Sequence, residues 1–367
     1  MCRALSLILV CFAALAQSPE QLFHDAVAAQ QRGDVAVAIA KYLELIQLRP
    51  DVLEAHANLG AALAASGKYD EAIQQYRAAL TLQPGNTALR LNLALAYYKS
   101  ADFATAAQEL GSLSKAEPAD VRIATLLGDC YARLGRNDDA IRLLTPVESA
   151  HPDDLGVAWT LGTVLIGAGR AHEGLRRVEA VAERGNSAEA YLLAAQTHLG
   201  LNEFERARAL ADAALRLNPQ LPGLYSVSGR IRQYLGDYPG AKADLEKALA
   251  ANAADFDAHV TLAAVLNADR DLDGAQMHAE RALAITPSSP LARYELARVE
   301  RSRGNIAAAV GGFEKVVQME PDWLSPHIEL AALYYRLNRP ADGQRERAIV
   351  DKLNEQGKKT GPNAVQP

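Results

Sequence analysis

The sequence predicts an all-α fold built from many short helices that pack in pairs, and two observations lead to this class. The chain of 367 residues is 49% hydrophobic but only 6% aromatic, and it is rich in Ala, which favours helices over strands. Proline and small residues also recur along the chain with one period of 34 residues, long enough for two short helices and their turns. A mainly β fold and a disordered chain are therefore excluded.

Prolines mark the end of each period, because proline cannot continue a helix and also restricts the residue before it. Glycines near the middle of the period, such as Gly67 and Gly135, predict the turn between the two helices. Glycine accepts the left-handed conformation that ends a helix, and the Asp or Asn that follows is expected to cap the next one. The first run of prolines is spaced by 34 residues: Pro50, Pro84, Pro118 and Pro152.

Two ladders of small residues share this period and fix the register. The first contains Ala26, Gly60, Ala94, Gly128, Gly162, Ala195, Gly229, Ala263, Ala297 and Ala331. The second contains Ala38, Ala72, Ala106, Ala140, Gly174, Ala207, Ala241, Ala275, Ala309 and Gly343. Members of the two ladders are expected to meet where two antiparallel helices approach most closely. Both ladders shorten to a step of 33 once, between Gly174 and Ala195, so we expect the missing residue in the linker 183–187.

At these residues the chain resembles the tetratricopeptide repeat family. The best unit is Leu53–Asn86, with Gly60, Ala72, Tyr76 and Pro84 at positions 8, 20, 24 and 32 counted from Leu53. The resemblance implies a right-handed α-α superhelix of about ten repeats over residues 17–356. The repeats are expected to start at Pro19, Leu53, Thr87, Val121, Leu155, Ala188, Pro222, Phe256, Pro290 and Leu324.

The two ends of the chain read differently from the repeats. Residues 1–16 combine Arg3 with an apolar run and a small-residue site at Ala14–Ala16, which predicts a secretory signal peptide. The alternative is an uncleaved N-terminal anchor, although the run is short for a membrane span. Cleavage would leave Cys130 as the one remaining cysteine. The polar tail 357–367 is expected to be disordered.

No catalytic or metal-binding constellation is predicted. His56, His259 and His327 all fall at position 4 of their units, so a shared structural role explains them better than a metal site. Cys130 falls on a predicted first helix, which favours a buried thiol over a reactive one. The sequence therefore predicts no cofactor, and the net charge of −6 offers no general attraction for nucleic acid.

A binding surface is predicted on the first helices, which line the inner, concave face in the family that the chain resembles. The family's ligand-contacting positions are non-uniform here, with Tyr and Arg enriched in the last four units. Two Asn residues at position 6, Asn58 and Asn92, match a weaker signal for gripping a peptide backbone. The remaining candidates are Tyr98, Lys99, Arg122, Arg133, Trp159, Arg230, Tyr234, Tyr294, Arg298, Arg301, Tyr335 and Arg336.

These features predict a non-enzymatic scaffold that binds a protein or peptide in the cell envelope, in the periplasm if the signal peptide is cleaved. Because Arg binds carboxylates in a bidentate manner, we expect units seven to ten to hold a peptide with an acidic group. A generic solvated face is the competing interpretation. Two alternative functions stay open: an assembly factor or chaperone for envelope export, and a regulatory subunit of an enzyme such as a glycosyltransferase.

Overall fold

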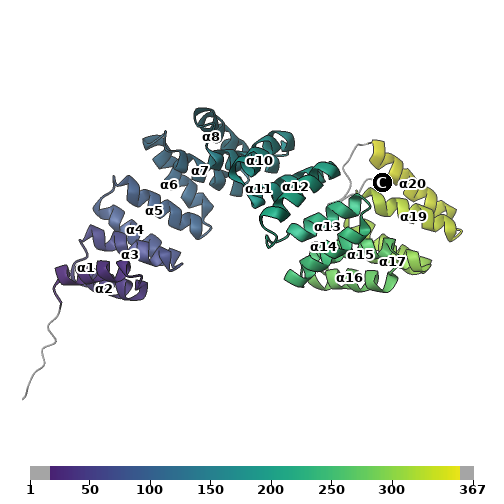
Figure 1. Cartoon of the computed structure of the whole chain (residues 1–367), viewed down its shortest axis with the longest axis horizontal. Coiled ribbons are helices and arrows are strands. Elements are labelled where there is room, and N and C mark those ends of the chain that lie inside the picture. The colour runs from purple at the N-terminus through teal and green to yellow at the C-terminus, as the bar shows by residue number, and fades with distance from the viewer. Residues whose placement is uncertain (1–16, 356–367) are drawn as a thin grey trace, which may run out of the picture. The chain divides into compact units, whose positions relative to one another are not determined.

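The computed structural model describes residues 17–355, which form twenty α-helices and no strand (Figure 1). The all-α repeat class is therefore confirmed. The predicted signal peptide at 1–16 and the predicted tail at 357–367 lie outside the described residues. The chain divides into two compact units, Met1–Arg177 and Val178–Pro367, and the division falls within α10.

The helices follow one another as antiparallel pairs within each unit. The first unit contains α1 (Pro19–Gln31), α2 (Val35–Leu48), α3 (Leu53–Ala65), α4 (Tyr69–Leu82), α5 (Thr87–Lys99), α6 (Phe103–Ala116), α7 (Val121–Arg133), α8 (Asn137–Ala150) and α9 (Leu155–Gly167). Helix α10 (Ala171–Gly185) spans the division. The second unit contains α11 (Ala188–Gly200), α12 (Phe204–Leu217), α13 (Leu224–Tyr234), α14 (Tyr238–Ala251), α15 (Phe256–Ala268), α16 (Leu272–Ile285), α17 (Pro290–Arg303), α18 (Ile306–Met319), α19 (Leu324–Arg336) and α20 (Pro340–Glu355).

Nine of the ten first helices begin at the residue where the sequence places the start of a repeat. The exception is α13, which begins at Leu224 instead of Pro222 because Gly223 takes a left-handed conformation with φ of 77°. The single step of 33 residues falls between α10 and α11, where Asn186 and Ser187 form a two-residue linker.

The small-residue ladders lie at the contact between the two helices of each pair. A Cβ atom added to Gly174 would come within 2.6 Å of the backbone oxygen of Gly162, so these two ladder positions touch directly. Elsewhere the first-ladder glycine makes room for a large side chain. An added Cβ on Gly128 would come within 2.6 Å of Leu144, which is fully buried.

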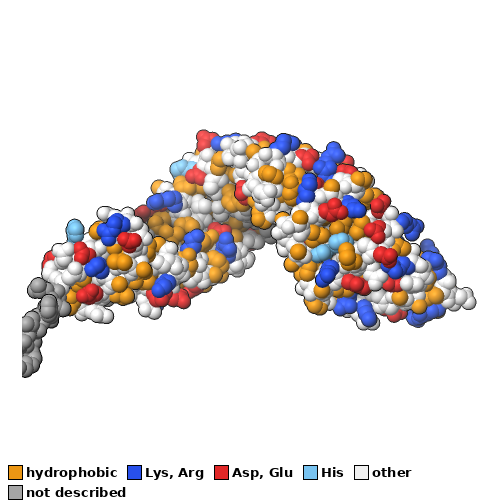
Figure 2. All heavy atoms as spheres, turned by 60° about the horizontal axis from the view of Figure 1, so that its bottom comes forward, with side chains coloured by type: hydrophobic (Ala, Val, Ile, Leu, Met, Phe, Trp, Pro, Cys, Tyr) orange, Lys and Arg blue, Asp and Glu red, His pale blue; other side chains and the backbone are white. Residues whose placement is uncertain are grey.

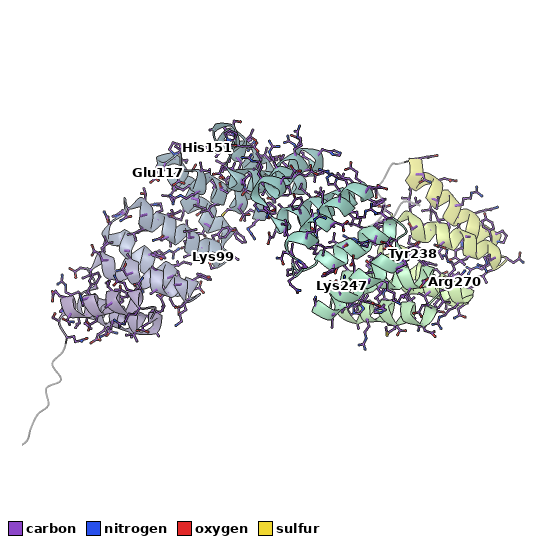
Figure 3. All side chains as sticks on the ribbon, viewed as in Figure 1. Lys99, Glu117, His151, Tyr238, Lys247 and Arg270 are labelled. Atoms are coloured by element: carbon purple, nitrogen blue, oxygen red, sulfur yellow. The ribbon has the colours of Figure 1, made fainter. Side chains whose placement is uncertain are left out.

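A left-handed residue ends the first helix of every pair, and glycine is not always present there. Gly67 and Gly135 take positive φ as predicted, but Ala101 and Arg270 occupy the same place with φ of 64° and 67°. Figure 3 labels Arg270 at the turn between α15 and α16. The capping expectation is only partly correct. Asp237 does accept a hydrogen bond from the Gly240 amide, whereas the N-cap residues of α4 and α8 are Lys68 and Arg136, without a side-chain cap.

The position-4 histidines have the shared structural role that their register predicts. His56 Nε2 lies 3.0 Å from the carbonyl oxygen of Pro50, at the end of the preceding repeat, and its Nδ1 lies 2.8 Å from Gln75 Oε1. His327 makes the same two contacts, with the Pro321 carbonyl and Glu346. One side chain thus ties the preceding turn to position 23 of its own repeat.

Cys130 is fully buried on α7, and burial raises the pKa of its thiol to about 11. A thiol with this pKa carries almost no thiolate at neutral pH, so the predicted structural role fits better than a reactive one.

The left-handed turn at Ala101 gives a stability prediction. An L-residue pays about 1–2 kcal/mol in this conformation, so Ala101→Gly should raise the free energy of unfolding by about 0.5–1 kcal/mol once the entropy of the unfolded glycine is subtracted. Urea unfolding followed by far-UV circular dichroism measures the change. The reverse substitution, Gly135→Ala, is the matched control and should destabilise. A lower midpoint for Ala101→Gly would show that the turn is not strained.

Candidate functional site

The first helices line the inner face of each unit. Successive first helices contact one another, as α7 does α9, α13 does α15, and α15 does α17, whereas no two successive second helices within residues 17–355 make a comparable contact. Elements that lie closer together on one side of a stack form its concave side. The predicted binding residues are all on these first helices.

In the first unit, the structure brings two predicted residues together through a third. The Tyr98 hydroxyl donates to Asp129 Oδ2 at 2.6 Å, and Arg133 Nε donates to the same oxygen at 2.7 Å. The Arg133 guanidinium also lies 5.0 Å from the centre of the Phe103 ring and 5.5 Å from that of Tyr98. This cluster links α5, α6 and α7.

The other predicted residues of the first unit do not join this cluster. Asn92 and Lys99 are exposed on α5, where Figure 3 labels Lys99 at the end of the helix. Asn58 is half-buried on α3, and Trp159 is half-buried on α9. Arg122 pairs with the N-cap carboxylate of its own helix, that of Asp120, at 2.7 Å.

The second unit contains a pocket of about 440 Å³ on the inner face. Such a volume lies within the range of ligand pockets. Its walls come from three first helices and the start of α14, where Figure 3 labels Tyr238. The lining residues are Gln233, Tyr234, Tyr238, Leu291, Tyr294, Glu295, Arg298, Trp323, Ser325, Ile328 and Glu329.

Aromatic rings form one wall of this pocket. The Tyr294 ring packs 4.8 Å from the Trp323 ring and 5.5 Å from that of Phe313, measured between centroids. Burial raises the pKa of the Tyr294 hydroxyl to about 12, so the ring stays neutral. Tyr234 stacks on Phe204 with centroids 4.9 Å apart. These contacts hold the rings in place before any ligand arrives.

Two ion pairs form the charged part of the pocket. The Arg298 guanidinium donates to both Glu295 oxygens at 3.1 Å. Arg301 donates to Glu329 Oε1 at 2.6 Å, from α17 to α19. Only 5% of the Glu295 surface is exposed, and this burial raises the pKa of its carboxyl, against the attraction of Arg298. The two arginines predicted to bind an acidic ligand are thus already paired within the chain.

Three other predicted residues lie beside this centre. Arg230 is half-buried on α13 near Tyr234. Tyr335 and Arg336 are exposed at the end of α19. Among the described residues, neither Arg230 nor Arg336 has a carboxylate partner. On the face shown in Figure 2, acidic and basic side chains are interspersed, and neither sign forms a large patch.

Two searches of residues 17–355 add no further kind of site. They contain no group of three or more His, Cys, Asp or Glu side chains arranged to hold a metal ion. Within the same range, every helix is too short or too polar to cross a bilayer.

Two family profiles, both described as tetratricopeptide repeats, match the chain. One matches residues 63–130 and 100–163, and the other matches 26–87, 160–222 and 227–290. Together they cover more than half of the sequence. The chain is a tetratricopeptide repeat protein. Proteins of this family are typically non-catalytic scaffolds that bind other proteins or peptides.

Solved structures share the fold of this tetratricopeptide repeat protein. The crystal structure of the APC/C hetero-tetramer Cut9-Hcn1 matches with a TM-score of 0.53 at 13% identity, covering 93% of this chain and 90% of that chain. The crystal structure of yeast Tom70 matches with a TM-score of 0.40 at 14% identity, covering 92% of this chain and 96% of that chain. No curated protein matches the sequence. Identities this low show a common fold and no common partner.

Sequence reasoning missed four residues of the pocket. Glu295 and Glu329 both occupy position 6 of their repeats, the place of Asn58 in the second repeat. A carboxylate at a half-buried helix position signals a partner nearby, and Arg298 stands three residues after Glu295. Trp323 and Tyr238 lie outside the first-helix positions that the family pattern highlights, so that pattern gave no signal for them.

The buried ion pair of this repeat protein gives a second stability prediction. Arg298→Met leaves the Glu295 carboxylate buried without its partner and should cost about 3 kcal/mol in the free energy of unfolding. Arg301→Met is the matched control: Glu329 is more exposed, so the loss should be about 1 kcal/mol or less. The double variant Glu295→Met with Arg298→Met should recover most of the loss. Equal midpoints for the two single variants in chemical unfolding would contradict this assignment.

Proposed function

We propose that this protein is a non-enzymatic scaffold that binds an extended or helical peptide segment of a partner protein in the inner-face pocket of the second unit. The observation that carries the proposal is the preformed aromatic wall of Tyr234, Tyr294 and Trp323 beside exposed Tyr238 and Ile328. Aromatic side chains supply large contact area at little entropic cost, which is why they dominate binding hot spots.

The charges of the pocket refine the expected ligand. Glu295, Arg298, Arg301 and Glu329 neutralise one another, so the centre of the pocket favours an apolar or aromatic side chain. An acidic group of the ligand would instead meet Arg230 or Arg336, which have no such partner among the described residues. We therefore expect an apolar anchor in the pocket flanked by an acidic residue.

Site-specific photo-crosslinking in the producing cell tests this proposal. A benzophenone amino acid in place of Ile328 or Tyr238, which are 42% and 40% exposed in the pocket wall, should give a discrete adduct with a partner. The same probe in place of Met277, which is 50% exposed on the second helix α16, is the matched control and should not. Ile328→Asp should reduce the Tyr238 adduct about tenfold. Equal adducts from Met277, or none from the pocket, would refute the proposal.

The identity of the adduct separates the open functions. A single enzyme captured in stoichiometric amount supports a regulatory subunit. Many unfolded envelope proteins support an assembly factor or chaperone. In either outcome the pocket residues act by binding and carry out no chemistry.

We further propose that the protein works in the cell envelope, in the periplasm, because residues 1–16 carry the pattern of a signal peptide. Cell fractionation followed by N-terminal sequencing tests this: the mature protein should appear in the periplasmic fraction and begin at Gln17. A chain that keeps Met1 and sediments with membranes would support the anchored alternative, and a cytoplasmic chain would refute export.

A further inference from the structure

The contact between position 4 and position 23 is complete in four repeats, with three different pairs of side chains. In the third repeat, Arg90 donates through Nη2 to the Pro84 carbonyl at 3.3 Å and through Nη1 to Glu109 at 3.0 Å. A His–Gln pair, a His–His pair and a His–Glu pair make the equivalent contacts in the second, eighth and tenth repeats. The first helix of each is thereby tied to both its neighbours.

The ninth repeat has the first half of this contact without the second. Arg293 Nη2 donates to the Pro287 carbonyl at 2.7 Å, as Arg90 does to Pro84. Position 23, however, is Gly312, which has no side chain to meet the guanidinium. Arg293 forms no ion pair with any residue between 17 and 355. The place that Glu109 fills in the third repeat is therefore empty here.

A pocket of about 490 Å³ occupies this place. It lies between α16, α17 and α18, so two of its three walls are second helices and it is separate from the inner-face pocket. Gly311 widens it further, since an added Cβ there would meet nothing within 4 Å. The lining residues are Gln276, Glu280, Arg293, Leu296, Ala297, Glu300, Ala308, Gly311, Gly312 and Lys315.

The charges around the pocket leave its cations available. Of the two carboxylates in the lining, Glu280 accepts from Gln276 Nε2 and Glu300 from Asn305 Nδ2, each at 2.7 Å. Lys315 on α18 has no carboxylate partner among the described residues. The pocket thus presents an Arg293 edge and an ammonium group to one volume, and a carboxylate is the group that matches both.

We infer that this outer pocket is a second binding site, which receives the carboxylate of a Glu or Asp side chain from a partner protein. The incoming carboxylate takes the place that Glu109 holds in the third repeat and accepts from Arg293 Nη1. The role of a partner rests on the proposed scaffold function. The carboxylate preference of the pocket does not, and it can be measured without any partner.

Disulfide tethering measures this preference in the full chain. Gly311→Cys places a thiol in the pocket wall, where the added side chain has room. The protein is equilibrated with a mixture of 3-mercaptopropionate, 2-mercaptoethanol and cysteamine, and the modified peptide is quantified by mass spectrometry. The carboxylate thiol should exceed the neutral one about fivefold or more, as expected for a charge-assisted hydrogen bond in a half-buried site. The native thiol of Cys130 is fully buried and does not compete.

Two controls make the result decisive. Gly85→Cys lies in an exposed linker with nothing within 4 Å and should show no carboxylate preference. Arg293→Gln in the Gly311→Cys background keeps an amide donor for the Pro287 carbonyl, and circular dichroism confirms its folding; it should abolish the preference. A preference equal at the two cysteine positions, or one that survives Arg293→Gln, would overturn the inference. Either result would leave the inner-face proposal standing, because the crosslinking test does not involve Arg293.

Discussion

The close approach of two helix backbones within each pair is the constraint on which the rest of the structure depends. Where Gly174 touches Gly162, no side chain can intervene. A large residue at either ladder position would separate the helices and break the stacking of the next pair on both of them. This requirement explains the Ala-rich composition, since each repeat needs two small residues at fixed places. It also leaves the outward positions free to vary, and binding residues can only arise there.

The repeat architecture could be predicted because it follows from local physics. Proline ends a helix, glycine closes a turn and small residues permit contact, so nine of ten first helices begin where the sequence places them. The start of α13 was missed because a left-handed Gly223 overrides the register. The pairing of Arg301 with Glu329 could not be predicted, because the two residues are 28 positions apart in sequence and meet only through the rotation between neighbouring repeats. For the same reason, the sequence suggested an acidic ligand for arginines that the fold already satisfies.

Each repeat must also be tied to the one before it, and this junction tolerates several chemistries. His56 with Gln75 and Arg90 with Glu109 share no residue type, yet both bridge the preceding proline turn and the second helix. A device that depends on geometry more than on identity can lose one half without loss of the fold. The ninth repeat is such a case: the Arg293 bond to the Pro287 carbonyl stays, while Gly312 gives up the other half.

The two pockets of the second unit therefore differ in kind. In the inner pocket, charges are paired within the chain, so they orient the walls and add little net field; a ligand gains mainly from aromatic area. In the outer pocket, the same class of cation is left without its partner, so a ligand gains from charge. Removing a charge from water is costly unless a partner compensates it. An arginine half-satisfied by a backbone carbonyl, with its second edge over an open volume, has paid part of that cost before binding. A partner that presents an apolar anchor to one face and a carboxylate to the other would therefore be selected by both together, although neither pocket alone is selective.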